Sequence, residues 1–252
     1  MSAGAWVQDI AQGVINGGSS ASATISLTVG TSVLAGDLIV VRVFGYTSSN
    51  STTNCSVSDN GPGYTYNTAA YSSDGNDCVW IFFAIATSGL ASSSIVTVHL
   101  SNLSLRGGTA TIAAASATEH AGPFLSSPLD QVQSNTQSAV TSLTTGTTGT
   151  LTQASELAVA AFAFVSSTSA TITLTSTNSF TTRTSSQFGW APNGGQRMGV
   201  LASDKVVNAT TALAGTGTVG TSLSVAVSAV ATLKLATDPY PLGYPPPSRT
   251  WW

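Results

Sequence analysis

The two cysteines, Cys55 and Cys78, are the residues of the chain that could form a covalent cross-link. They lie in predicted strands on either side of a turn-rich segment at 59–75, where a bond across strands or between sheets is geometrically plausible. Such a bond would stabilise the fold by about 3 kcal/mol and would indicate an oxidising location. The alternative is a pair of buried free thiols. We expect the disulfide, and we expect no metal site, because two thiols without a nearby histidine offer too few ligands.

The two histidines, His99 and His120, are the candidates for a general base. His99 alternates with valines in a predicted strand, and we expect it to be structural. His120 lies close to a glycine, and we expect a turn residue that hydrogen bonds to Asp130. A catalytic base would need a serine partner, and the sequence has no Gly-x-Ser-x-Gly motif. We therefore expect a non-enzymatic protein with no catalytic residue and no cofactor.

Ten carboxylates are available for acid–base chemistry or for calcium binding. Glycoside hydrolysis needs two facing carboxylates, but most acids of this chain lie in predicted turns or at strand starts, where they cap backbone groups. Asp37 and Glu156 hold matching places in the two halves of the sequence, which favours a repeated structural cap. Asp74, Asn76 and Asp77 could bind calcium through oxygen atoms. We favour the alternative, a polar hairpin tip.

Exposed aromatic side chains could stack on the sugar rings of a host-surface glycan. Trp190 lies in a loop-like segment, 188–194, and is the candidate for such a surface-binding residue. The alternative for Trp190 is a lid over the core or a contact between subunits. Trp80 lies in an apolar run and is expected in the core. Three tyrosines flank another loop-like segment: Tyr64, Tyr66 and Tyr71.

The composition indicates which elements position these residues. Charged residues make up only 7% of the chain, hydrophobic residues make up 42%, and Ser and Thr together number 75. A disordered chain would lack this much apolar material, and β-branched residues favour strands. Seven scattered cations form no basic stripe, so we expect no nucleic-acid partner.

Alternating and β-branched runs recur along the chain with turn signals between them, and no stretch has the pattern of a capped amphipathic helix. In the first half, the predicted strands are 22–29, 36–46, 54–58, 64–71, 77–87, 94–101 and 108–119. The second half repeats this order, since 36–41 (GDLIVV) corresponds to 155–160 (SELAVA). The pseudo-repeats cover about 20–122 and 139–236.

Such a repeat could mean two separate small domains or one body made of two intertwined halves. We prefer a single body over 1–237, because 123–154 is short for a linker and its Pro128-Leu129-Asp130 sequence is typical of an ordered chain. The predicted fold class is all-β: an antiparallel double-sheet sandwich, jelly-roll-like, built from two pseudo-repeated halves.

The last segment, 238–252, differs in composition from the body. Five prolines fix φ and remove donors, which predicts an extended polyproline-II tail with a reach of roughly 40 Å. Its four aromatic residues have no strand pattern that would bury them, and we expect them to be assembly contacts; the alternative is a disordered terminus. These residues are Tyr240, Tyr244, Trp251 and Trp252.

Residues 1–6 have no basic region followed by an apolar one, and no apolar run approaches the roughly 18 residues of a membrane span. We expect no membrane insertion. Either a signal peptide has been removed, or the protein leaves the cell by another route, such as assembly into a virus particle that is released by lysis.

The order of these signals resembles a β-sandwich domain family of bacterial surface proteins and of tailed-phage virion proteins. The resemblance covers about 1–236 and is carried by short pieces: Gly36-Asp37-Leu38, Ser56-Val57-Ser58-Asp59, Val79-Trp80-Ile81-Phe82-Phe83, Glu119-His120-Ala121-Gly122 and Pro128-Leu129-Asp130. It implies a jelly-roll-like sandwich with a structural or adhesive role, and it supplies no catalytic residues.

Together these observations predict a virion structural protein, either a capsid decoration protein or a head/tail accessory protein. Its partners would be further copies of itself or a major capsid protein, at the virion surface or outside the cell. The first alternative is a secreted adhesin or carbohydrate-binding module, and the second is a subunit of an extracellular filament built by strand exchange.

Overall fold

A computed structural model describes the chain except residues 1, 17–19, 106–110, 167–172, 191–195 and 237–252. The described part is all-β, as predicted, and contains no α-helix. A single 3₁₀ turn, η1 (Thr52–Asn54), interrupts the strands. The strands are β1 (Trp6–Asn16), β2 (Ala23–Thr28), β3 (Leu38–Tyr46), β4 (Cys55–Asp59), β5 (Asn67–Ser73), β6 (Asp77–Ile85), β7 (Ile95–Leu100), β8 (Ile112–His120), β9 (Phe124–Thr144), β10 (Ser155–Ser166), β11 (Leu174–Thr177), β12 (Thr181–Trp190), β13 (Gln196–Asn208) and β14 (Thr216–Leu235).

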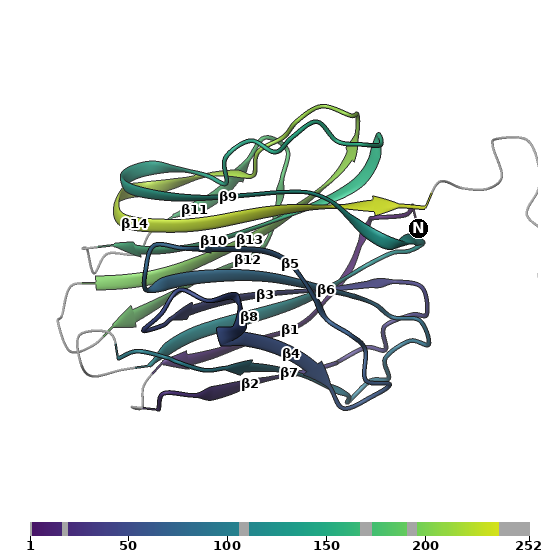
Figure 1. The fold of residues 1–252 in the computed structure, drawn as a ribbon, viewed down its shortest axis with the longest axis horizontal. Coiled ribbons are helices and arrows are strands. Elements are labelled where there is room, and N and C mark those ends of the chain that lie inside the picture. Colours follow the sequence, from purple (N-terminus) through teal and green to yellow (C-terminus); the bar gives the residue numbers. More distant parts are fainter. Residues whose placement is uncertain (1, 17–19, 106–110, 167–172, 191–195, 237–252) are drawn as a thin grey trace, which may run out of the picture.

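These strands form three antiparallel sheets, so the predicted double-sheet sandwich is wrong in the number of its layers. A central sheet has the order β1-β8-β3-β6-β5, a small outer sheet the order β2-β7-β4, and a large outer sheet the order β11-β14-β10-β13-β12, with β9 paired to β14. Figure 1 shows the central sheet between the two outer ones. The third layer is needed because both faces of the central sheet are apolar and must be covered.

Two hydrophobic cores follow from this stacking. Alternate residues of β3 and β6, such as Val41 and Trp80, pack against the small outer sheet. The residues between them, such as Val40 and Ile81, pack against β10 and β14 of the large outer sheet. Every residue of β6 from Asp77 to Ala84 is therefore buried. A third cluster covers the outer face of the large sheet.

The two halves of the chain share a strand order. In the first half β3 lies between β6 and β8, and β5 pairs with β6; in the second half β10 lies between β13 and β14, and β12 pairs with β13. The segments 36–41 and 155–160, which correspond in the sequence, contain the starts of β3 and β10. Superposition of the two halves stays a prediction.

The strand β9 closes one side of the stack. It pairs with β14 along most of its 21 residues, and its other side approaches β5 of the central sheet. There Ser72 Oγ donates to the carbonyl oxygen of Asn135 at 3.2 Å, and Thr136 Oγ1 donates to that of Ser73 at 3.4 Å. β9 therefore links the large outer sheet to the central sheet while keeping much of its own surface exposed.

Candidate functional site

The predicted disulfide is absent, because Cys55 and Cys78 are both buried free thiols. Cys55 lies on β4 of the small outer sheet and Cys78 on β6 of the central sheet, within one hydrophobic core. The Cys78 sulfur lies 3.2 Å from each of the hydroxyl oxygens of Thr47 and Ser73. Burial, followed by the neighbouring Cys78, raises the pKa of Cys55 well above its ordinary value, so the Cys55 thiol is not poised for reaction.

Most of the other sequence-predicted site residues lie outside the described part of the chain. The backbone of Trp190 ends β12 and pairs with Gln196, but its side chain lies outside the described residues. The tail residues Tyr240, Tyr244, Trp251 and Trp252 also lie outside them. The segment considered for calcium is a hairpin tip, in which Asp74 Oδ1 accepts from the backbone N–H groups of Asn76 and Asp77 at 3.0 and 2.8 Å.

The structure instead gathers charged residues in the space between the central and large outer sheets. Arg183 of β12 donates two hydrogen bonds to Asp204 of β13, from Nε at 2.6 Å and from Nη2 at 2.7 Å. The fully buried Arg42 of β3 donates to Thr118 Oγ1 at 2.9 Å and to the carbonyl oxygen of Ser203 at 3.4 Å. We call Arg42, Thr118, His120, Arg183 and Asp204 the Asp204 cluster.

The expectation that His120 is a turn residue bonded to Asp130 is wrong. His120 is fully buried at the end of β8, with its Nε2 atom 3.1 Å from Thr118 Oγ1 and 3.8 Å from Asp204 Oδ2. Burial lowers the pKa of His120 to about 3. A catalytic triad needs the hydroxyl and the carboxylate on opposite ring nitrogens, whereas both approach Nε2. The Asp204 cluster therefore holds charge inside the fold and lacks the geometry of a triad.

Sequence reasoning missed the Asp204 cluster, although one signal for it is present. Arg42 interrupts the apolar run of β3, and a buried guanidinium must find a partner. Burial lowers the pKa of Arg42 to about 10, while Asp204 opposes that shift, so Arg42 stays charged at neutral pH. The partner strand β13 lies about 160 residues further along the chain, and no local pattern identifies it.

An exposed tryptophan lies at the outer end of this cluster. Trp6 of β1 is 38% exposed, and the guanidinium carbon of Arg183 lies 4.9 Å from its ring centroid, which is cation–π geometry. A depression of about 390 Å³ adjoins it, and we call this the Trp6 depression. Its polar lining residues are Ser179, Thr181, Arg183, Asp204 and Lys205.

A second buried acid lies at the start of β10. Glu156 is fully buried, and neither of its carboxyl oxygens accepts a hydrogen bond from a donor in the described part of the chain. Burial raises the pKa of Glu156 to about 7, and the nearby Asp130 adds to that rise. Asp130 accepts from Thr152 and lies 3.7 Å from Lys234. These contacts outweigh its burial and lower the pKa of Asp130.

Glu156 therefore keeps its proton to a higher pH than an exposed glutamate does, beside the ionised carboxylate of Asp130. Both side chains are covered, since the Asp130 side chain is only 3% exposed and Glu156 is not exposed at all. A substrate would not reach them in this conformation. Glu156 lies on β10 and Asp130 on β9, and the structural cap that the sequence suggested for Glu156 stays a prediction.

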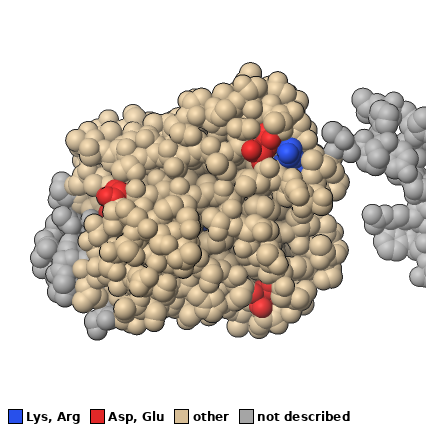
Figure 2. Space-filling model, in the orientation of Figure 1, with Lys and Arg blue, Asp and Glu red and all other residues tan. Residues whose placement is uncertain are grey.

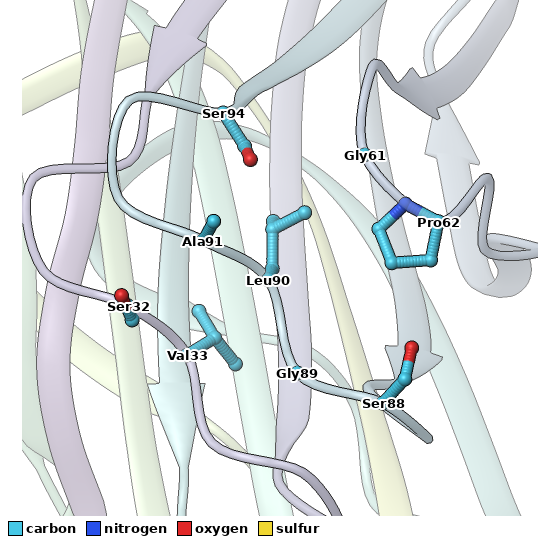
Figure 3. Close-up of a pocket in the computed structure, with 9 residues that line it drawn as sticks. All are labelled: Ser32, Val33, Gly61, Pro62, Ser88, Gly89, Leu90, Ala91 and Ser94. Carbon is cyan, nitrogen blue, oxygen red and sulfur yellow. The ribbon is translucent and has the colours of Figure 1, made fainter.

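Two adjoining depressions surround Pro62, and we call them together the Pro62 groove. One, of about 470 Å³, includes Val33 and Leu90; Figure 3 shows these side chains with Pro62 and the serines around them. The other, of about 530 Å³, includes Tyr64, Phe83 and Ser126. The two share Pro62 and Ser88, and no lining residue of either is charged.

The molecular surface is poor in charge. Figure 2 shows a face on which acidic and basic side chains are few, with the basic patch beside an acidic one and the other acidic patches far from it. Across the described residues, no group of three or more His, Cys, Asp and Glu side chains could hold a metal ion. Among those same residues, no helix has the length and apolar character needed to cross a bilayer.

The chain matches no protein-family model, no curated protein and no solved structure. What the fold itself establishes is an all-β protein made of antiparallel sheets.

Proposed function

We propose that the chain is a non-enzymatic structural protein of a phage-like virion, acting as a capsid decoration protein or a head/tail accessory protein that stabilises the particle. Its partners are further copies of itself or the major capsid protein, and its place is the virion surface. The resemblance of its sequence signals to tailed-phage virion proteins supports this proposal. The matched strand orders of the two halves support the finer expectation of jelly-roll-like repeats.

The observation that carries the proposal is the character of β9. This strand pairs on one side only, with β14, and its one charged residue is the covered Asp130. Soluble proteins usually protect an edge strand with charges that oppose further pairing. The exposed part of β9 instead presents hydroxyl and amide side chains around three apolar ones, Leu125, Leu129 and Val132. Such a surface favours a lasting contact with another protein.

The distribution of charge supports the same function. The Asp204 cluster and the Asp130–Glu156 pair hold charged groups inside the fold, where they lock sheets and strands together. An outer surface dominated by hydroxyls and amides keeps nearly the same potential when salt or pH changes. This suits a protein that must remain in a packed assembly outside a cell.

A rebinding experiment tests the proposal. Labelled full-length protein is added to particles from which it has been stripped, and its cosedimentation is measured. We expect saturable rebinding at a fixed number of copies per particle. Leu129→Lys on β9 should weaken it at least tenfold, whereas Leu34→Lys should not, since Leu34 is 63% exposed on another part of the surface. Rebinding that never saturates, or that is equal for both variants, would contradict the proposal.

The Trp6 depression favours a second candidate, a glycan-binding adhesin or carbohydrate-binding module. An exposed indole beside hydroxyl, carboxylate and cationic groups is suited to stacking on a sugar ring while its hydroxyls are hydrogen bonded. Isothermal titration calorimetry with a panel of host-surface oligosaccharides tests this function. Binding that is lost in Trp6→Ala and kept in Trp6→Phe would support it, and a flat titration across the panel would exclude it for those sugars.

A further inference from the structure

The Pro62 groove has rigid walls. Asp59 Oδ1 accepts from the backbone N–H groups of Gly61 and Gly63 at 2.9 and 3.0 Å, and its Oδ2 accepts from that of Tyr64 at 2.8 Å. The Tyr64 hydroxyl in turn donates to the carbonyl oxygen of Gly89 on the opposite wall. The groove therefore exists before any ligand arrives, which lowers the entropy cost of binding.

The chemistry of the groove favours an apolar ligand with few charges. The lining of one depression combines the apolar side chains of Phe83, Ile85 and Pro62 and the ring of Tyr64 with the hydroxyl groups of serines and threonines. An aromatic and proline-lined groove without charges is the kind of surface that receives proline-rich segments with bulky side chains. The stiffness of such segments reduces what they lose on binding.

A segment of this composition begins beside the groove. The last residue of β14, Leu235, is paired with Phe124, and Ala236 N–H donates to the carbonyl oxygen of Pro123 at 3.0 Å. Ser126, two residues after Phe124, lines the groove. Figure 1 shows β14 ending at the rim of the body. The chain continues for 16 residues, 237–252, which include five prolines and end in two tryptophans.

We propose that the Pro62 groove binds the C-terminal segment 239–252 of a second copy of this chain. An extended polyproline-II chain of fourteen residues at about 3.1 Å each would span roughly 40 Å, which is long enough to reach the groove of a neighbouring copy. The contact is heterologous, since tail and groove are different surfaces, so it builds a ring or an open row of subunits. This inference rests on the proposed assembly function and names its contact.

The test uses full-length variants and sedimentation velocity. The tail variant is Trp251→Ser/Trp252→Ser, and the groove variant is Thr65→Arg, since Thr65 is exposed and lines the groove. The matched control is Thr24→Arg on β2, an exposed threonine that lines neither depression and lies away from β9 in the chain. Circular dichroism and melting confirm that each is folded. We expect wild type and the control to self-associate with the same constant, and each variant alone to associate at least tenfold more weakly.

Mixing the two variants gives the sharpest result. The groove variant keeps an intact tail and the tail variant an intact groove, so the mixture should form a 1:1 complex and nothing larger. Any of four results would overturn the inference: a monomeric wild type, undiminished association in either variant, an equal loss of association in the control, or no complex on mixing. A change in tail tryptophan fluorescence without a change in mass would mean binding within one chain, which also overturns it. If the protein is still found in purified particles, the proposed function survives any of these failures.

Discussion

Replacing Glu156 by glutamine should make the protein more stable at high pH and leave it unchanged at low pH. In the folded protein the pKa of Glu156 is about 7, against an ordinary value of 4.5. Between these values the folded state holds a proton that the unfolded state has lost, so the contribution of Glu156 to stability falls as pH rises. Each pKa unit corresponds to about 1.4 kcal/mol, so the loss is about 3 kcal/mol by pH 8. The glutamine side chain has nearly the same size and stays neutral at every pH, as protonated Glu156 is at low pH.

The assay is urea unfolding of wild type and Glu156→Gln across pH 4 to 8, with the difference in unfolding free energy plotted against pH. The difference isolates Glu156, whereas the wild-type curve alone would hide it. The lowered pKa of His120, about 3, makes stability fall as pH drops below the ordinary value of 6.5, which opposes the effect of Glu156. We expect a difference near zero at pH 4 that rises to about 3 kcal/mol at pH 8, or roughly 6–12 °C in melting temperature. A difference that does not change with pH, or a variant less stable at pH 8, would refute the raised pKa of Glu156.

Three further changes test the fold. Thiol labelling of the unfolded, unreduced protein should modify both Cys55 and Cys78. The folded protein should label at neither, because the two residues are 5% and 0% exposed. A lack of labelling after unfolding would mean a disulfide. Arg183→Gln should lower the free energy of unfolding by about 3 kcal/mol or more, because it leaves the buried Asp204 without its bidentate partner. Adding Asp204→Asn to the same chain should recover part of that loss in a double-mutant cycle. Full additivity of the two substitutions would contradict the pairing. Gly199→Ala should destabilise by about 1–3 kcal/mol, because its new methyl group would lie 1.9 Å from the Phe164 ring on the neighbouring strand; unchanged urea unfolding would show that this contact relaxes freely.

Much of the first half was predictable because its strands are buried in regular patterns. The expected segments 36–46 and 94–101 match β3 (Leu38–Tyr46) and β7 (Ile95–Leu100) within two residues. β1 and β9 were missed because both are edge strands with many polar residues, and an edge strand does not need the alternation that burial on one face imposes. In β9 the Ser, Thr and Gln residues are typical of a loop, yet they form the longest strand described.

The sequence did contain a signal for the third sheet, but a search for alternating polar and apolar residues does not reveal it. The uninterrupted apolar runs of β3 and β6 can be satisfied only if both faces of their sheet are covered, and that requires a third layer. Whether the two cysteines form a disulfide could not be predicted from the sequence in this way. Cys55 and Cys78 do lie on facing strands of two sheets, but whether they bond depends on sub-ångström placement and on neighbours such as Thr47, which strand patterns do not specify.

The most direct test of the assembly function is a quantitative mass-spectrometric inventory of gradient-purified particles from the source of this chain. The proposed function predicts that the protein is present at a fixed ratio to the major capsid protein and stays with the particles through high-salt washing, because its outer surface offers few charges for salt to screen. Absence from the particles, together with recovery from the cell surface or the free medium, would contradict it.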